Sequence, residues 1–378
     1  MGEMADMLFN TAGRLAFSIL IVAYLFGDLA INCTAVAKSL RDVTCTHTNK
    51  NNLSTTTPSY ALDLTDPCWD KESLTRTDAY RIYVAIFYLL IGPFAFFNVT
   101  KTKYLQIFTT ILRWAAFGTM MILATMRIAD SSSVHGSPKS ADFSATPHVF
   151  GVAVYAFMCH HSIPSVVSPI KNKSSIASIL ATDYLLITTF YLALAYTGTF
   201  AFPNVPDLYT LAFQPQAGSN PSVDLRIVDY FLTLFPVFTL STNWPVLAIT
   251  LRNNLETMFT DFSICSNMST TVKRLIFPLL ATIPPILLAL GTEDLAVLVT
   301  ITGAYAGVGI QFVIPCSLVF FARRRLRTLE SNLNSDIENP LESLFKHASF
   351  VFLVLAMSLI AVGLVTAKFI MNSIKSET

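Results

Sequence analysis

Long apolar runs recur along the whole chain, and they restrict its possible folds more than any other feature. A transmembrane helix needs about 20 consecutive, mostly apolar residues. By this criterion the sequence predicts nine spans, at approximately 12–37, 81–97, 104–127, 146–168, 178–200, 227–250, 275–291, 295–321 and 347–370. Because 53% of the residues are hydrophobic and only 13% are charged, one soluble core could not bury these runs. We therefore expect an all-α, multi-pass membrane protein with a single transmembrane domain over residues 1–378.

Lys and Arg residues are concentrated in alternate loops, and their distribution predicts the orientation of the chain in the bilayer. They follow the second, fourth, sixth and eighth spans, at Lys101, Lys103, Lys171, Lys173, Arg252, Lys273, Arg274, Arg323, Arg324, Arg325 and Arg327. The intervening loops are poor in basic residues. We expect a cytoplasmic N-terminus, a cytoplasmic linker at 322–346, and a C-terminus in a lumen or outside the cell.

The longest polar loop covers residues 40–80, and the predicted orientation places it in a lumen or outside the cell. It contains the sequence Asn52-Leu53-Ser54, a signal for N-glycosylation at Asn52. Cys45 and Cys68 both lie in this loop. Because such compartments are oxidising, we predict a disulfide between these two cysteines.

Charge and motif content argue against several functional classes. The net charge of +1 gives no reason to expect a nucleic-acid partner. The six cysteines show no metal-binding spacing, and no arrangement of nucleophile, base and oxyanion donor is evident. We expect neither an enzyme nor a metal site, although His160, His161 and Asp28 could in principle perform acid–base chemistry.

The stretch from Tyr155 to Pro169 begins as a membrane helix and then contains Cys159-His160-His161-Ser162 followed by a proline. A helix break within lipid frees backbone groups that have no water to bond. Breaks are tolerated where they line a watery cavity, and transporters place substrate sites there. One histidine would bond to the freed backbone while the other faces the cavity or titrates. A purely structural role for both is the alternative.

Asp28 lies within the first predicted span, with Asn32 one helical turn later. An ionisable residue at the centre of a span costs at least about 2.5 kcal/mol, so it needs an explanation. The spacing of four residues places both side chains on one helix face, where they could share a cation, a proton or a polar ligand. A structural hydrogen-bonded pair that ties two helices together is the alternative.

The sixth predicted span carries Ser241, Thr242 and Asn243 between Pro236 and Pro245. Hydroxyl and amide oxygens beside a backbone loosened by proline suit a hard cation such as Na⁺. Ser and Thr are equally common where membrane helices pack together. Both interpretations follow from these residues.

Two motifs resemble the amino acid/auxin permease family, within the amino acid–polyamine–organocation superfamily of transporters. They are CHHSIPS at 159–165 and GAYAGVG at 303–309, the latter followed by Pro315. The small residues of the second motif also predict close helix packing, and a flexible gating segment is the alternative. The resemblance implies a LeuT-like permease fold with two inverted five-helix repeats, in which the first and sixth helices are broken. The segment at 155–165 would be that sixth helix.

The resemblance implies secondary transport of amino acids or similar small solutes, coupled to Na⁺ or H⁺ and without a cofactor. It assigns a substrate role to Phe157, Cys159, His160, His161 and Ser162 and an ion role to Ser241 and Thr242. To these we add Asp28 and Asn32 for substrate and Asn243 for the ion. The family's first two spans have no counterpart in this sequence, so we expect an incomplete chain that is weakly active or inactive alone. The alternative is a membrane sensor or scaffold that uses the same cavity without transport.

Overall fold

The computed structural model describes residues 2–45, 63–69, 74–97, 103–131, 133–141, 143–171, 173, 175–214, 223–261, 268–333, 345 and 347–377. These residues form helices and one isolated β-bridge, between Pro67 and Thr75. The α-helices are α1 (Gly2–Leu8), α2 (Thr11–Thr44), α3 (Arg76–Ile91), α4 (Lys103–Ala129), α5 (Thr146–Ala156), α6 (Ile163–Val167), α7 (Ile176–Ala201), α8 (Val223–Asp261), α9 (Thr270–Gly291), α10 (Leu295–Ile301), α11 (Ile314–Leu333) and α12 (Ala348–Glu377). Short 3₁₀ turns are η2 (Gly92–Phe96), η3 (Phe143–Ala145) and η4 (Tyr209–Phe213), and η5 (Thr302–Gly307) and η6 (Gly309–Val313) are π-helical.

Eight helical segments among the described residues are long and apolar enough to cross a membrane. This confirms a multi-pass helical membrane protein. The predicted span at 146–168 is not among the eight, because it is divided between α5 and the five-residue helix α6. The ninth crossing therefore stays a prediction.

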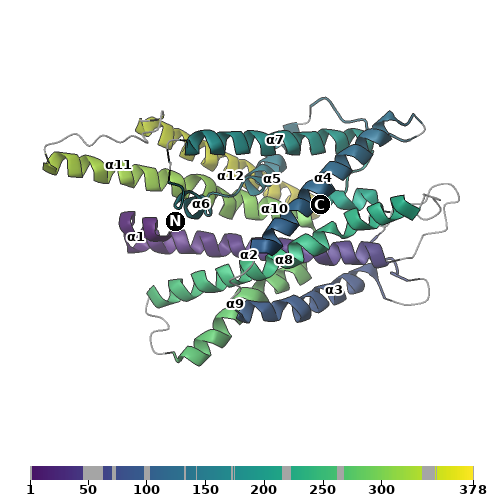
Figure 1. Ribbon diagram of the computed structural model, residues 1–378, viewed down its shortest axis with the longest axis horizontal. Coiled ribbons are helices and arrows are strands. Elements are labelled where there is room, and N and C mark those ends of the chain that lie inside the picture. Colours follow the sequence, from purple (N-terminus) through teal and green to yellow (C-terminus); the bar gives the residue numbers. More distant parts are fainter. Residues whose placement is uncertain are drawn as a thin grey trace.

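Helix α2 runs through the middle of the bundle (Figure 1). It packs against α3, α8 and α9 on one side and against α10 and η5 on the other. Leu25, Leu29 and Ala37 of α2 belong to the largest hydrophobic cluster, and the buried Trp244 indole of α8 donates to the Leu29 carbonyl at 3.2 Å. An apolar sequence on all sides suits a helix that is enclosed by others. Residues on α2 are thus well placed to face the centre of the molecule.

Glycines bring α2, α5 and the π-helical segments into close contact. A side chain at Gly27 of α2 would collide with Thr302, and one at Gly303 would collide with the Gly151 carbonyl of α5. Small residues permit this backbone approach, and π-helical turns often occur at functional sites. The predicted close packing around 303–309 is therefore confirmed.

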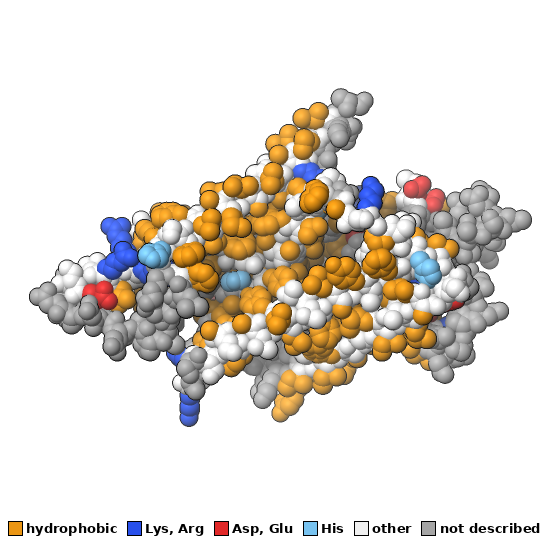
Figure 2. All heavy atoms as spheres, turned by 90° about the horizontal axis from the view of Figure 1, so that it is seen from above, with side chains coloured by type: hydrophobic (Ala, Val, Ile, Leu, Met, Phe, Trp, Pro, Cys, Tyr) orange, Lys and Arg blue, Asp and Glu red, His pale blue; other side chains and the backbone are white. Residues whose placement is uncertain are grey.

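The outer surface of the bundle is apolar over much of its length, as Figure 2 shows. Leu89, Leu185 and Leu359 are 72%, 69% and 69% exposed. In a water-soluble protein such a surface would drive aggregation, whereas lipid chains cover it without cost. The surface agrees with the composition in placing the bundle in a bilayer.

Among the helices that extend beyond their predicted ends, α2 and α11 reach the predicted polar loop and linker. Helix α2 continues to Thr44, past the predicted end at 37 and into the predicted loop 40–80. Helix α11 continues to Leu333, into the predicted linker 322–346. Both extensions are polar. On α2, Lys38 pairs with Asp207 and Arg41 pairs with Asp42, and the Arg- and Leu-rich extension of α11 has high helix propensity. The sequon residue Asn52 lies outside the described residues.

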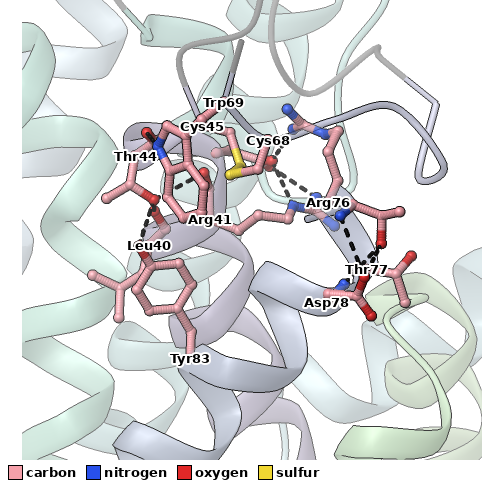
Figure 3. Close-up of a disulfide and its surroundings, with 12 residues drawn as sticks. Leu40, Arg41, Thr44, Cys45, Cys68, Trp69, Arg76, Thr77, Asp78 and Tyr83 are labelled. Atoms are coloured by element: carbon pink, nitrogen blue, oxygen red, sulfur yellow. Dashed lines mark hydrogen bonds and ion pairs between the residues drawn. A yellow bond between two sulfur atoms is a disulfide. The ribbon is translucent and has the colours of Figure 1, made fainter. Parts of the chain in front are cut away.

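A disulfide joins Cys45 to Cys68, the pair that the sequence analysis selected, at the end of α2 (Figure 3). The neighbouring Trp69 indole donates to the Thr44 carbonyl at 3.0 Å. The Tyr83 hydroxyl of α3 donates to the Thr44 hydroxyl at 2.7 Å. Trp69 is therefore fastened to the end of α2, and Tyr83 joins the same end of α2 to α3.

Four buried or partly buried charges lie beside the disulfide. Asp42 of α2 accepts from Arg41 at 2.8 Å and from Arg76 of α3 at 2.5 Å. Arg41 also pairs with Glu293, just before α10. We call these four residues the ion network. It joins α2, α3 and the start of α10 at one end of the bundle.

Candidate substrate site

The break in the membrane helix lies where the sequence predicts it. Helix α5 ends at Ala156, and the chain turns so that the Ser162 N–H donates to the Cys159 carbonyl at 2.9 Å. Helix α6 begins at Ile163 with Pro164 in its first turn. Proline is tolerated there because the first N–H groups of a helix have no intrahelical acceptor. The six residues 157–162 form the break, and this prediction is confirmed.

The two histidines of the break carry polar atoms without partners in the described part of the chain. The Nδ1 atoms of His160 and His161 are buried and make no hydrogen bond there. The backbone N–H groups of both residues likewise reach no backbone carbonyl among the described residues. Among the described residues, neither histidine therefore forms the predicted bond to freed backbone. A buried polar group without a partner costs about 1–3 kcal/mol, so these atoms call for a bound molecule.

One side of the break faces α2. The ring of Tyr24 lies 5.4 Å from that of His161, measured between centroids. The Tyr155 hydroxyl of α5 donates to Asp28 at 2.6 Å, and longer contacts of 3.4 Å and 3.5 Å reach the same carboxyl group from Tyr24 and Asn32. The predicted pairing of Asp28 with Asn32 is present, although it is long. Asp28 and the break are thus brought together around two tyrosines.

The Asp28 carboxyl group is 8% exposed and lies in the interior of the bundle. Its partners in the described part of the chain are neutral, and no Lys or Arg there forms an ion pair with it. A carboxylate buried without a counter-charge is costly, so the group must be protonated or meet a cation. The hydrogen bond from Tyr155 to Asp28 also ties α2 to α5, as expected if Asp28 has a structural role. Both roles are compatible with this geometry.

The other side of the break faces α7. The Cys159 sulfur lies 2.9 Å from the Tyr184 hydroxyl. The ring of Phe157 stacks on Tyr184 with centroids 6.1 Å apart and meets Tyr191 edge-on at 5.5 Å. Ser162 is exposed. The break therefore has an aromatic wall on one side and a carboxyl group on the other.

The residues predicted to bind an ion lie elsewhere, on α8. Thr242 donates to the Thr239 carbonyl at 2.9 Å, and Ser241 and Asn243 form no side-chain hydrogen bond with the described residues. Helix α8 stays helical through its two prolines. Since Pro245 has no N–H, the Ser241 carbonyl lacks its helical donor. No hydrogen bond or ion pair among the described residues joins this group to Asp28 or to the break, so the ion site remains a prediction.

Sequence reasoning missed three aromatic residues of the site, namely Tyr24, Tyr155 and Tyr184. Tyr24 had a detectable signal, because it lies four residues before Asp28 and hence on the same helix face. Tyr155 and Tyr184 lie on different helices, and their roles depend on how those helices pack. Spacing within one span could not reveal them.

Comparison with known proteins places this geometry in context. The sequence matches the family described as transmembrane amino acid transporter protein over residues 2–371. It is 45% identical to the Transmembrane protein 104 homolog of Drosophila melanogaster, over 97% of this chain and 72% of the relative. It is 44% identical to Transmembrane protein 104 of Homo sapiens, over 99% of this chain and 73% of the relative. No solved structure matches the chain.

Proposed function

The chain belongs to the transmembrane amino acid transporter protein family, and from this premise we propose that it binds an amino acid or a similar small solute at the helix break and carries it across the membrane. The observation that supports this site is that the buried Nδ1 atoms of His160 and His161 have no partner among the described residues, close to the buried carboxyl group of Asp28. Transporters bind solutes at such breaks, since the freed backbone can bond the solute.

The chemistry of the break suits a zwitterion. The backbone N–H groups of His160 and His161, together with their imidazole rings, can donate to a solute carboxylate. A solute ammonium group would find acceptors at Asp28 and at the hydroxyls of Tyr24 and Tyr155. The aromatic wall formed by Phe157 and Tyr184 would contact an apolar side chain.

The coupling cation in this proposal is H⁺ or Na⁺, with Asp28 as its primary site. A carboxyl group that lacks a fixed counter-charge can change its protonation or take up a cation during transport. Ser241, Thr242 and Asn243 form a second proposed cation site, supported by the Ser241 carbonyl, which lacks its usual helical donor because Pro245 has no N–H. Replacing an H⁺ gradient with a Na⁺ gradient in a transport assay distinguishes the two ions.

We further propose a LeuT-like arrangement in which one bundle of helices rocks against the other around the break. The broken span would count as the ninth crossing. The basic loops would then be cytoplasmic and the disulfide end would lie in a lumen or outside the cell. In this arrangement the ion network closes the disulfide end of the bundle.

The test begins with binding to the purified chain in detergent micelles. Each of the common amino acids is screened for a ligand-induced rise in Tm, and those that bind are then tested for uptake into proteoliposomes. His161→Ala and Asp28→Asn should each raise the ligand concentration needed for the same rise in Tm about tenfold or more. Each variant loses a charged or charge-assisted contact with the ligand. His135→Ala, which removes an exposed histidine outside the site, should leave the shift unchanged.

The outcomes separate transport from its rival. Binding with uptake supports a transporter, and binding without uptake supports a sensor that uses the same cavity. If no amino acid or related solute shifts the Tm, or if His135→Ala weakens binding as much as His161→Ala, the proposed site is wrong.

A further inference from the structure

A polar cavity, separate from the helix break, lies between α11 and the start of α12. Its volume is about 550 Å³, within the range of roughly 300–1,000 Å³ that is common for small-molecule sites. It is lined by Phe320, Arg323, Arg324, Arg327, Thr328, Ser331, Ala348 and Val351. We call it the arginine pocket. Figure 2 shows basic side chains gathered at the left end of the molecule, where α11 ends in Figure 1.

The arginine pocket is positively charged because of the helical register of α11. Arg324, Arg327 and Ser331 follow one another at intervals of three and four residues, which places them on one helix face. None of the described residues that line the pocket is acidic. Arg325 lies on another face and donates to the Met7 carbonyl of α1 at 2.5 Å. Three guanidinium groups and two hydroxyls therefore line the pocket, and no carboxylate is among its described lining residues.

Arg323 is held at the pocket with one donor unused. Its Nη2 atom donates to the Phe345 carbonyl at 2.7 Å. Its Nη1 atom is buried and has no hydrogen-bond partner in the described part of the chain. A buried, charged donor without an acceptor is costlier than a neutral one. The geometry therefore calls for an additional acceptor in the pocket.

The start of α12 supplies the opposite wall. Ala348 and Val351 belong to its first turn, where N–H groups lack intrahelical acceptors and the helix dipole is positive. Phe320 of α11 meets Phe352 of α12 edge-on, with centroids 6.1 Å apart, and so holds the two helices together. An anion in the pocket would face guanidinium groups on one side and the positive end of a helix on the other.

The position of the pocket suggests where such an anion comes from. The apolar part of α11 ends at Phe321, and the arginines follow within one turn. Residues at this depth face lipid headgroups, and arginine forms paired hydrogen bonds with phosphate oxygens. The aromatic Phe320 side chain would contact the apolar part of a lipid.

We propose that the arginine pocket binds the phosphate groups of an anionic lipid headgroup, with a phosphorylated inositol lipid as the class that suits three arginines. This site is distinct from the solute site and does not depend on the proposed transport activity.

The test measures binding of a fluorescent dioctanoyl phosphatidylinositol bisphosphate to the intact purified chain in detergent. Arg324→Gln combined with Arg327→Gln should raise the Kd about tenfold or more, since two charge-assisted contacts are lost. Arg325→Gln removes the same type of charge from the same helix outside the pocket, and it should change the Kd less than about twofold. Replacing both pocket arginines with Lys should give an intermediate loss, because charge remains but paired bonding does not.

Competing compounds identify the source of the phosphate. Dioctanoyl phosphatidylcholine should not compete, and inositol trisphosphate, which has no acyl chains, should compete more weakly than the lipid. Equal competition by inositol trisphosphate or by inorganic phosphate would overturn the lipid assignment in favour of a soluble phosphate compound. Absence of binding, or an equal loss in Arg325→Gln, would overturn the site. The acidic residues Asp336, Glu338 and Glu342 lie outside the described residues. Because the assay uses the intact chain, any competition between their carboxylates and the lipid phosphates is included in the measured Kd.

Discussion

The disulfide end of the bundle and the helix break handle buried polar groups in opposite ways. At the disulfide end, Asp42 lies between two arginines and is completely buried. At the break, the Nδ1 atoms of His160 and His161 are also buried, yet they have no partner among the described residues. The first region pairs its buried carboxylates with arginines of the protein, whereas the two Nδ1 atoms of the second make no hydrogen bond with the described residues.

This difference distinguishes buried polar groups that stabilise the fold from buried polar groups that bind a ligand. A paired buried charge stabilises a helix contact only while its partner is present. An unpaired group reduces stability until a ligand supplies the missing bond, which is typical of binding sites. We therefore expect substitutions at the two regions to change stability in opposite directions.

The largest expected effect is at the ion network. Asp42→Ala should lower the free energy of unfolding by about 3–5 kcal/mol, because it removes the carboxylate that lies between the buried guanidinium groups of Arg41 and Arg76. The measurement is thermal or denaturant unfolding of the purified protein in detergent.

A surface ion pair provides the matched control for this prediction. Asp6 and Arg14 lie 3.4 Å apart with side chains 59% and 38% exposed, so Asp6→Ala should cost about 1 kcal/mol or less. If Asp42→Ala and Asp6→Ala lower stability equally, the ion network does not stabilise the bundle as argued.

The disulfide should contribute less than the ion network does. Replacing both Cys45 and Cys68 with Ser should lower stability by about 3 kcal/mol, because the bond closes a loop with a sequence separation of 23 residues. A reducing agent should lower the Tm of the unmodified protein and leave that of the double variant unchanged. Equal sensitivity of both proteins to reduction would show that the shift does not arise from the bond between Cys45 and Cys68.

The sequence best predicted the structural features that depend on a single helix. Apolar run length predicted the spans, and the polar sequence before Pro164 predicted the break, because both depend on local solvation of the backbone. The spacing of Asp28 and Asn32 also predicted their shared face. These features require no knowledge of how the helices are arranged.

Features that depend on contacts between helices could not be predicted in this way. Tyr184 is one of several aromatic residues on an otherwise apolar helix, and only packing places it against Cys159. The extension of α2 past residue 37 depends on Arg76, which is 34 positions from Asp42 in the sequence. The length of the apolar run predicted that the helix ends at residue 37, because the apolar run stops where the charged residues begin. It gives no information on whether those charges are paired in the fold.

The smallest expected effect on stability is at the break, and its sign is the most informative. His161→Leu should leave the free energy of unfolding unchanged or raise it by up to about 1 kcal/mol, because it removes a buried nitrogen that has no partner among the described residues and keeps apolar contact with Tyr24. The same variant should lose the ligand-induced rise in Tm. His135→Leu, at an exposed position, serves as the control for removal of a histidine. A loss of about 2 kcal/mol or more in His161→Leu alone would show that its imidazole has a structural partner, and the contrast between the two regions would then fail.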